Sequence, residues 1–367
     1  MTIAGSVVGC TEKKISAQDG PIRVQIPSLS DKTYSMQEVE LLTITDLSRL
    51  EGTAAQFFME PTSQDGEIVG KAPAVRFMKS KEGVYVAMDA LSLQLVTLYY
   101  QFERLMFLDQ QIGVATVNIW PRKVAINARF SSEDGSLLQN NALYSSAVDT
   151  YLFVPFTSED LPLMVNSGVI GHEHFHSIFN QIVMRPLGDR YPKSDLEDLY
   201  LPILLRGLNE GMADVWGWIF SKDSNFVGRS LPSEKLSRRL DFDVLSMPTR
   251  KELSSLIAHV PPEYEVSISY KLGNKLARSI YGLSKVMLNQ PGMTEDKVRI
   301  EMGKALVLTL SELRTFLDQK KPEDVMAPAQ ILFWFYKSLS LTTTAECEYF
   351  QNMVKDPDLV TAFSCKK

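Results

Sequence analysis

The chain of 367 residues carries 38 basic and 44 acidic side chains, for a formal net charge of −6, and 45% of its residues are hydrophobic. This composition is typical of a soluble globular protein and excludes a disordered chain, a collagen-like repeat and a polytopic membrane protein. The mild acidity argues against nucleic-acid binding, which requires a basic surface. Only four histidines and three cysteines are present, so chemistry that depends on them must be concentrated at few positions.

The chain begins with a short apolar segment, Met1 to Gly9, and residues 7–10 read Val-Val-Gly-Cys. This sequence resembles the lipobox of bacterial lipoproteins, in which the cysteine carries a lipid anchor. The resemblance implies an exported cell-envelope protein, with residues 1–20 as leader and linker and a membrane anchor at Cys10. A secreted or periplasmic protein, or a chance cysteine in a frayed N-terminus, is the alternative, because the apolar segment is short and no Lys or Arg precedes it. No run of 18 apolar residues predicts a membrane-spanning helix.

The segment from Ile22 to about Met88 has the residue types and turn signals of β-strands. Its β-rich runs are Arg23–Ile26, Val39–Ile44 and Val84–Ala87, and its turn signals are Asp65-Gly66 and Glu82-Gly83. Leu91–Leu108 carries apolar residues at helical spacing, which predicts one amphipathic helix. A second β-rich stretch follows and includes Thr116–Trp120 and Ser145–Phe156.

After about Ser167 the apolar residues recur every three to four positions, which predicts helices. These lie near residues 167–184, 206–221, 268–289, 295–319 and 325–340. The order of elements predicts an α+β fold, with a β-rich N-terminal lobe over residues 21–165 and a mostly helical C-terminal lobe over residues 166–345. Residues 346–367 form a C-terminal tail. Cys347 and the tail's second cysteine, Cys365, can pair outside the cytoplasm, and two free thiols are the alternative.

Three of the four histidines lie in residues 171–176, which read Gly-His-Glu-His-Phe-His. His172, Glu173 and His176 form the pattern H-E-x-x-H. Positions i and i+4 share one face of a helix, so the outer two histidines can bind one metal ion. Glu173 lies about 100° further round the helix, where its carboxylate can take a proton from a metal-bound water. His174 points away from that face and is not expected to be a ligand. Alone, this short pattern also occurs in helices without a metal.

A catalytic zinc site needs a third protein ligand and one open position. Residues 208–214 read Leu-Asn-Glu-Gly-Met-Ala-Asp and place Glu210 and Asp214 on one face of an otherwise apolar helix. Burial of two acids is costly unless cations compensate them. We therefore expect Glu210 to be the third zinc ligand and Asp214 to orient His172. Two exposed acids at a helix start, where acids are favoured, are the alternative.

H-E-x-x-H followed by N-E-x-x-x-D resembles the gluzincins, in particular the thermolysin-like zinc metallopeptidases. The resemblance implies a two-lobed fold with one catalytic Zn²⁺ between the lobes and endopeptidase activity on peptides or proteins. Shorter segments match in the same order, and together the matches cover about residues 90–285. Asn141 and Ala142 in Asn-Ala-Leu-Tyr resemble the edge-strand segment that binds the substrate backbone, and Arg238 in Arg-Arg-Leu resembles the arginine that meets a substrate carbonyl.

The chain departs from this family pattern in two respects. His176 and Glu210 are 34 positions apart, more than in thermolysin, which predicts an inserted loop over Met184–Tyr200. Tyr270 stands at the start of the helix where the family has its transition-state-stabilising histidine. The remaining histidine, His259, lies 11 residues upstream, and either residue can donate a hydrogen bond to an oxyanion. No clear counterpart of the family's calcium cluster is present, and the sequence makes no prediction about calcium.

These residues predict a zinc metallopeptidase in which Glu173 acts as the general base and Tyr270 or His259 stabilises the transition state. One alternative is a cell-envelope lipoprotein that uses the metallopeptidase fold for binding or assembly, motivated by the missing histidine and the inserted loop. An aminopeptidase on the same scaffold is a weaker alternative, because the chain has no G-x-M-E-N segment. The sequence makes no prediction about the preferred substrate or the oligomeric state.

Overall fold

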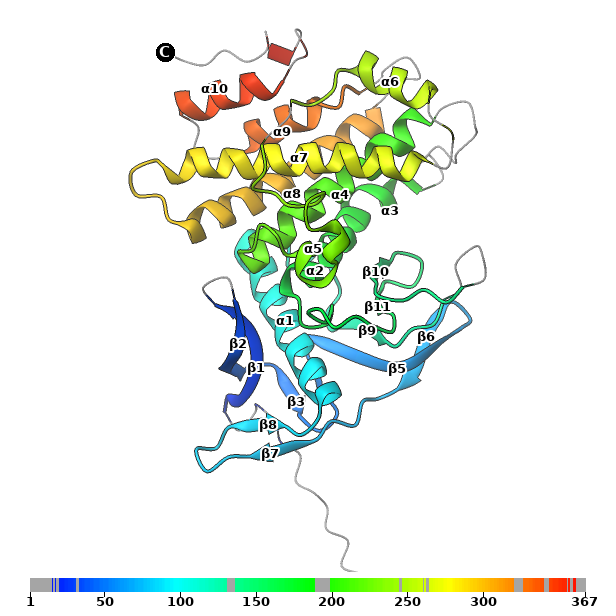
Figure 1. Ribbon diagram of the computed structural model, residues 1–367, viewed down its shortest axis with the longest axis vertical. Helices are drawn as coiled ribbons and strands as arrows, with labels where there is room; N and C mark the ends of the chain where they lie inside the picture. Colours follow the sequence, from blue (N-terminus) through cyan, green and yellow to red (C-terminus); the bar gives the residue numbers. More distant parts are fainter. Residues whose placement is uncertain are drawn as a thin grey trace, which may run out of the picture.

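The chain's structure is a computed structural model that describes residues 15, 17, 20–30, 33–130, 136–188, 199–243, 246–259, 261, 264–319, 326–339, 343–354, 356 and 359–360. It combines β-sheets and helices, as the α+β prediction requires. In the described chain the strands end at residue 153, and every element from residue 167 onward is helical. Figure 1 shows the strands in the lower half and most helices in the upper half, with α1 (Ala90–Ile112) rising from one to the other.

The strands belong to three sheets. A four-stranded sheet has the order β2-β1-β8-β7, a five-stranded sheet has the order β10-β11-β9-β5-β6, and β3 and β4 form a two-stranded sheet. The strands are β1 (Ile22–Ser30), β2 (Thr33–Leu41), β3 (Ile44–Asp46), β4 (Glu51–Gly52), β5 (Ala55–Gln64), β6 (Glu67–Lys71), β7 (Phe77–Lys79), β8 (Tyr85–Ala87), β9 (Arg122–Ile126), β10 (Ala142–Ser145) and β11 (Thr150–Phe153). Strand β10 pairs only with β11 among the described residues, so it is an edge strand.

The predicted helices are present with small shifts in their ends. Beside α1 they are α2 (Ser167–Phe179), α4 (Tyr200–Ser221), α7 (Glu265–Leu288), α8 (Glu295–Gln319) and α9 (Gln330–Ser338). Four further helices were not predicted: α3 (Arg185–Leu187), α5 (Val227–Ser230), α6 (Arg250–Ala258) and α10 (Thr344–Met353), the last of which covers part of the predicted C-terminal tail. A π-helical turn over Asn180–Met184 joins α2 to α3, and a 3₁₀ turn covers Pro232–Glu234. Most of the predicted inserted loop, residues 189–198, lies outside the described residues.

One predicted strand, Val39–Ile44, is interrupted in the structure. Strand β2 ends at Leu41, and β3 begins at Ile44. Between them the backbone N–H groups of Leu42 and Thr43 donate to the carboxylate of Glu103 at 2.6–3.0 Å, and this carboxylate lies buried on α1. A buried carboxylate must be hydrogen-bonded, so Glu103 takes the N–H groups that would otherwise continue the strand.

The prediction of a strand over Thr116–Trp120 was wrong, because these residues form turns. The strand lies directly afterwards, in β9, where Arg122 to Ile126 pair in parallel with β5 and with β11. A strand that pairs in parallel on both sides must be central in its sheet. The residue types of a segment do not show whether its strand will be central.

Helix α4 packs closely against α2 and α7 because glycines face each other at the contacts. A Cβ atom on Gly211 would lie 2.5 Å from the carbonyl oxygen of Gly273 in α7. A Cβ atom on Gly217 would lie 2.7 Å from the carbonyl oxygen of Gly168 in α2. Contacts this short exclude any side chain. The close approach brings polar residues of α2, α4 and α7 to the walls of one cavity.

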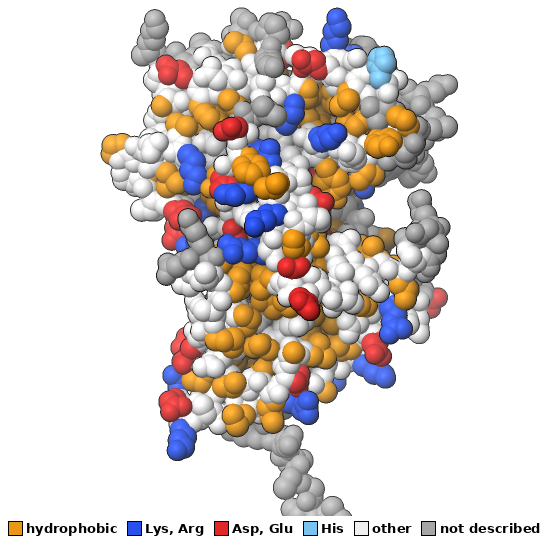
Figure 2. All heavy atoms as spheres, viewed as in Figure 1, with side chains coloured by type: hydrophobic (Ala, Val, Ile, Leu, Met, Phe, Trp, Pro, Cys, Tyr) orange, Lys and Arg blue, Asp and Glu red, His pale blue; other side chains and the backbone are white. Residues whose placement is uncertain are grey.

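Hydrophobic and basic side chains occupy different parts of the face that Figure 2 shows. Hydrophobic side chains cover much of the lower half, over the strands and α1, and Lys and Arg side chains gather across the middle of the helical half.

Among the described helices, none combines the length and the hydropathy that a membrane-spanning segment requires. Cys347 is buried in α10 and is disulfide-bonded, whereas Cys10 and Cys365 lie outside the described residues.

Candidate metal centre

The start of α2, which carries the H-E-x-x-H pattern, is held by one buried asparagine. The side-chain oxygen of Asn166 accepts hydrogen bonds from the backbone N–H groups of Gly168 and Val169, so Asn166 is the N-cap of the helix. Its side-chain nitrogen donates to the carbonyl oxygen of Phe226 and to the hydroxyl of Ser230, both at 2.8 Å. The beginning of α2 is therefore tied to the segment that follows α4.

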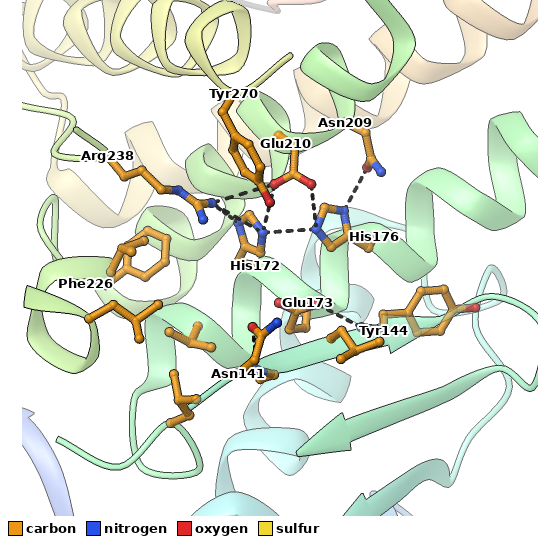
Figure 3. Close-up of a pocket in the computed structure, with 16 residues that line it drawn as sticks. Asn141, Tyr144, His172, Glu173, His176, Asn209, Glu210, Phe226, Arg238 and Tyr270 are labelled. Atoms are coloured by element: carbon orange, nitrogen blue, oxygen red, sulfur yellow. Dashed lines mark hydrogen bonds and ion pairs between the residues drawn. The ribbon is translucent and has the colours of Figure 1, made fainter. Parts of the chain in front are cut away.

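The predicted ligands meet between α2 and α4 (Figure 3). One ligand atom from each of His172, His176 and Glu210 lies within 4.8 Å of the other two. The Nε2 atoms of the two histidines are 3.0 Å apart, and Glu210 oxygens lie 3.5 Å from Nε2 of His172 and 3.9 Å from Nε2 of His176. Three ligands of a tetrahedral zinc ion, each at about 2.0–2.1 Å, are separated by about 3.3 Å from one another. The observed separations fit such a site.

The hydrogen bonds of the two imidazoles engage both Nδ1 atoms and leave the two Nε2 atoms facing each other. Nδ1 of His172 lies 2.9 Å from a carboxylate oxygen of Asp214, and Nδ1 of His176 lies 3.0 Å from the side-chain oxygen of Asn209. A proton on each Nδ1 satisfies both contacts, because the carboxylate and the amide oxygen are acceptors. Two Nε2 lone pairs that face each other at 3.0 Å need a proton or a metal ion between them. Oε2 of Glu210, 3.5 Å from Nε2 of His172, is also buried and forms no hydrogen bond within the described chain.

The electrostatics of the metal-free site follow from these contacts. Burial alone would lower the pKa of His172, but the nearby carboxylates of Asp214 and Glu210 raise this pKa to about 9. Burial would raise the pKa of Glu210, but the two histidines lower it to about 2. Without metal, His172 is thus protonated at neutral pH and Glu210 is ionised. A metal ion that takes the place of this proton releases it to solvent.

Glu173, the predicted general base, lines the same cavity and is hydrogen-bonded by strand β10. Its Oε2 accepts a hydrogen bond of 2.8 Å from the backbone N–H of Tyr144 in β10. Glu173 is 7% exposed, and burial raises the pKa of its carboxyl group. A raised pKa makes the carboxylate a stronger base.

The cavity has a volume of about 310 Å³ and lies between edge strand β10 and helices α2, α4 and α7. It contains every predicted ligand and Glu173, together with the expected substrate-binding residues Asn141, Ala142 and Arg238. One part of the wall is apolar and consists of Leu163, Val169, Phe226, Val227 and Leu231. The cavity therefore presents an apolar surface beside the polar residues.

Arg238 lies beside the ligands and contacts Asp214 and Tyr270. Its Nη2 is 2.5 Å from Oδ1 of Asp214 and 3.8 Å from Oε2 of Glu210, and its guanidinium group stacks on the ring of Tyr270 at 5.3 Å. Burial would raise the pKa of Asp214, but the charge of Arg238 lowers it and keeps this carboxylate ionised. An ionised Asp214 holds the Nδ1 proton of His172 in place.

The structure separates the two residues proposed to stabilise the transition state. Tyr270 lies in α7, lines the cavity and directs its hydroxyl toward the ligands (Figure 3). His259 is the exposed C-cap of α6, where its Nδ1 lies 2.6 Å from the carbonyl oxygen of Ser255, and it does not line the cavity. Burial raises the pKa of Tyr270 to about 12, which keeps its hydroxyl protonated.

Two contacts of the site were not expected from the sequence. Asn209 holds His176 through its side chain, although this asparagine is part of the N-E-x-x-x-D motif and could have been recognised there. Tyr144 holds Glu173 through its backbone, a contact that no side-chain pattern reveals. His174 points away from the ligands, as expected, and its ring bonds Asp109 and Tyr151, each at 2.9 Å.

Comparisons with known proteins do not assign the chain to a family. No protein-family model matches the sequence, and a search of curated proteins finds no significant match.

Proposed function

We propose that the chain is a zinc-dependent metalloendopeptidase with a two-lobed, thermolysin-like fold. One observation carries the proposal: Nε2 of His172, Nε2 of His176 and the carboxylate of Glu210 converge at zinc-like separations in a cavity that also contains Glu173. His172, His176 and Glu210 would hold the ion. When bound, zinc supplies a Lewis acid and lowers the pKa of a water molecule.

Each residue around the ligands has a chemical task in this reaction. Glu173, held by the Tyr144 backbone, takes a proton from the attacking water and passes it to the leaving amine. The Tyr270 hydroxyl donates a hydrogen bond to the oxyanion that forms at the scissile carbonyl. Asp214 and Asn209 keep the protons of the two histidines on Nδ1, so that both Nε2 atoms point to the metal.

The free edge of β10 suits an extended peptide substrate. A peptide can add as a further strand beside Ala142, because β10 pairs with only β11 among the described residues. Asn141, directly before this strand, lines the same cavity and can bond the peptide backbone. The apolar wall near Phe226 would then receive an apolar side chain next to the cleaved bond.

We also propose that Cys10 carries a membrane anchor. This proposal rests on the lipobox-like sequence alone, because residues 1–14 lie outside the described residues.

The test of the proposed function combines metal analysis with hydrolysis of a broad peptide library. Purified protein is expected to contain one zinc per chain and to lose hydrolysis after treatment with a chelator. Glu173→Gln is expected to keep zinc while hydrolysis falls about 10²- to 10⁴-fold, because only the proton acceptor is removed. His172→Ala is expected to lose both zinc and activity. A protein free of zinc after zinc reconstitution, or full activity of Glu173→Gln, would contradict the proposal.

A further inference from the structure

A second cavity, of about 500 Å³, lies where α1, α4 and α8 meet. It is separate from the metal centre: Phe220 at its wall follows Glu210 by ten residues on α4, which is about 15 Å along the helix axis. The charged side chains that line it are Arg104, Lys222, Arg299 and Asp296, three cations and one carboxylate.

Arg104 contributes a positive charge that no carboxylate of the described chain neutralises. Its guanidinium donates to the side-chain oxygen of Gln101 at 2.9 Å and to the carbonyl oxygen of Phe220 at 3.3 Å, and both acceptors are neutral. The guanidinium also stacks on the Phe220 ring at 4.6 Å. Burial lowers the pKa of Arg104, an effect that Tyr100 opposes and the nearby charge of Arg299 reinforces. Within the described chain, Arg104 is therefore a half-buried cation without an anionic partner.

The other two cations share one exposed acid. Lys222 lies 2.8 Å from a carboxylate oxygen of Asp296, Arg299 bonds the same oxygen, and the Asp296 side chain is 69% exposed. Arg299 is only 9% exposed, and its Nε is buried without a hydrogen-bond partner in the described chain. One solvated carboxylate does not offset three cations in a cavity.

Capping of α4 explains these basic residues only in part. Arg299 donates to the carbonyl oxygen of Ile219, and Arg104 donates to that of Phe220, so both satisfy carbonyls at the C-terminal end of the helix. The end of a helix contributes roughly half a negative charge. The lining has a net charge of +2, which comes from three basic side chains and one acidic one, so most of the positive charge is left over.

We propose that this cavity binds the phosphate group of a small soluble phosphate ester. A phosphate monoester carries a charge of about −1.5 to −2 at pH 7, which complements the net charge of the lining. Guanidinium groups bind phosphate oxygens through paired N–H donors, and two arginines are present. The apolar side chains of Phe107, Leu108 and Ile300 also line the cavity and can contact the rest of the ester.

The proposal is tested by calorimetric titration of the full chain with phenyl phosphate, inorganic phosphate and benzoate at equal ionic strength. Phenyl phosphate is expected to bind more tightly than benzoate, which has the ring but a single negative charge. Binding that is equally tight in His172→Ala places the ligand away from the metal centre. Failure of both phosphates to bind the unmodified chain, or benzoate binding as tightly as phenyl phosphate, would overturn the proposal.

Variants that remove either a positive or a negative charge from the cavity lining test the site directly. Arg104→Gln and the more exposed Lys222→Gln are each expected to weaken phenyl phosphate binding, roughly 10- to 100-fold for the arginine, because a charged hydrogen-bond donor is lost. Asp296→Asn is expected to strengthen binding by up to about fivefold, because a repelling charge is removed. Arg314→Gln is the matched control. Arg314 lies on α8, as Asp296 does, but it does not line the cavity, so binding is expected to stay unchanged. Equal affinities in all four variants would also refute the site.

Discussion

Replacement of Tyr270 by phenylalanine tests whether the Tyr270 hydroxyl stabilises the transition state in the proposed site. The hydroxyl of Tyr270 lies in the cavity with the metal ligands, whereas His259 is exposed at the end of α6 and is absent from the cavity lining. If the phenol donates to the oxyanion, Tyr270→Phe removes this donor and leaves the ring stacked against Arg238. The Tyr270 hydroxyl forms no hydrogen bond within the described chain, so its removal leaves no protein group without a partner.

The expected size of the effect follows from that geometry. Loss of one oxyanion donor lowers kcat about 10²- to 10³-fold, or about 2.7–4 kcal/mol of transition-state stabilisation. KM is expected to change little, because the donor acts mainly on the charge that develops during the reaction. The free energy of unfolding is expected to change by less than about 0.5 kcal/mol, since no buried hydrogen bond is lost. Steady-state hydrolysis of a fluorogenic peptide and urea denaturation measure these quantities.

His259→Ala is the matched control for this experiment. It removes an exposed side chain that bonds, among the described residues, the carbonyl oxygen of Ser255, and kcat and KM are expected to stay at their original values. The reasoning would be refuted if Tyr270→Phe retained full activity or if His259→Ala caused the larger loss of kcat.

Three further predictions concern metal affinity and stability. Asp214→Asn is expected to weaken zinc binding about 10- to 100-fold in competition with a chelator, because His172 loses the carboxylate that orients it. Zinc affinity is expected to rise about tenfold per pH unit below pH 9, since metal binding displaces the proton from His172, whose pKa is about 9; a pH-independent affinity would contradict this. Gly273→Ala is expected to destabilise the protein by about 1–3 kcal/mol in urea denaturation, because its Cβ would lie 2.8 Å from the carbonyl oxygen of Gly207.

The long helices were predicted well because their signal lies in the local order of residues, whereas α6 and α10 were not predicted. Apolar side chains at three- to four-residue spacing mark one buried face, and the ends of α7 and α8 fall within a few residues of their predicted positions. The strands were predicted less well, since pairing depends on distant residues. Strand β2 stops because Glu103, 61 positions from Leu42, binds the next N–H groups, and β9 is central because two other strands flank it.

The sequence by itself determined which side chains share a helix face. His172 and His176 in α2, and Glu210 and Asp214 in α4, are each four positions apart, and helical geometry turns that spacing into a common direction. The tertiary structure decided which faces meet. Glycine contacts draw α7 against α4 and bring Tyr270 to the ligands, while α6 holds His259 in solvent. Helical spacing specifies direction within one element, whereas the approach of two elements depends on packing across the whole core.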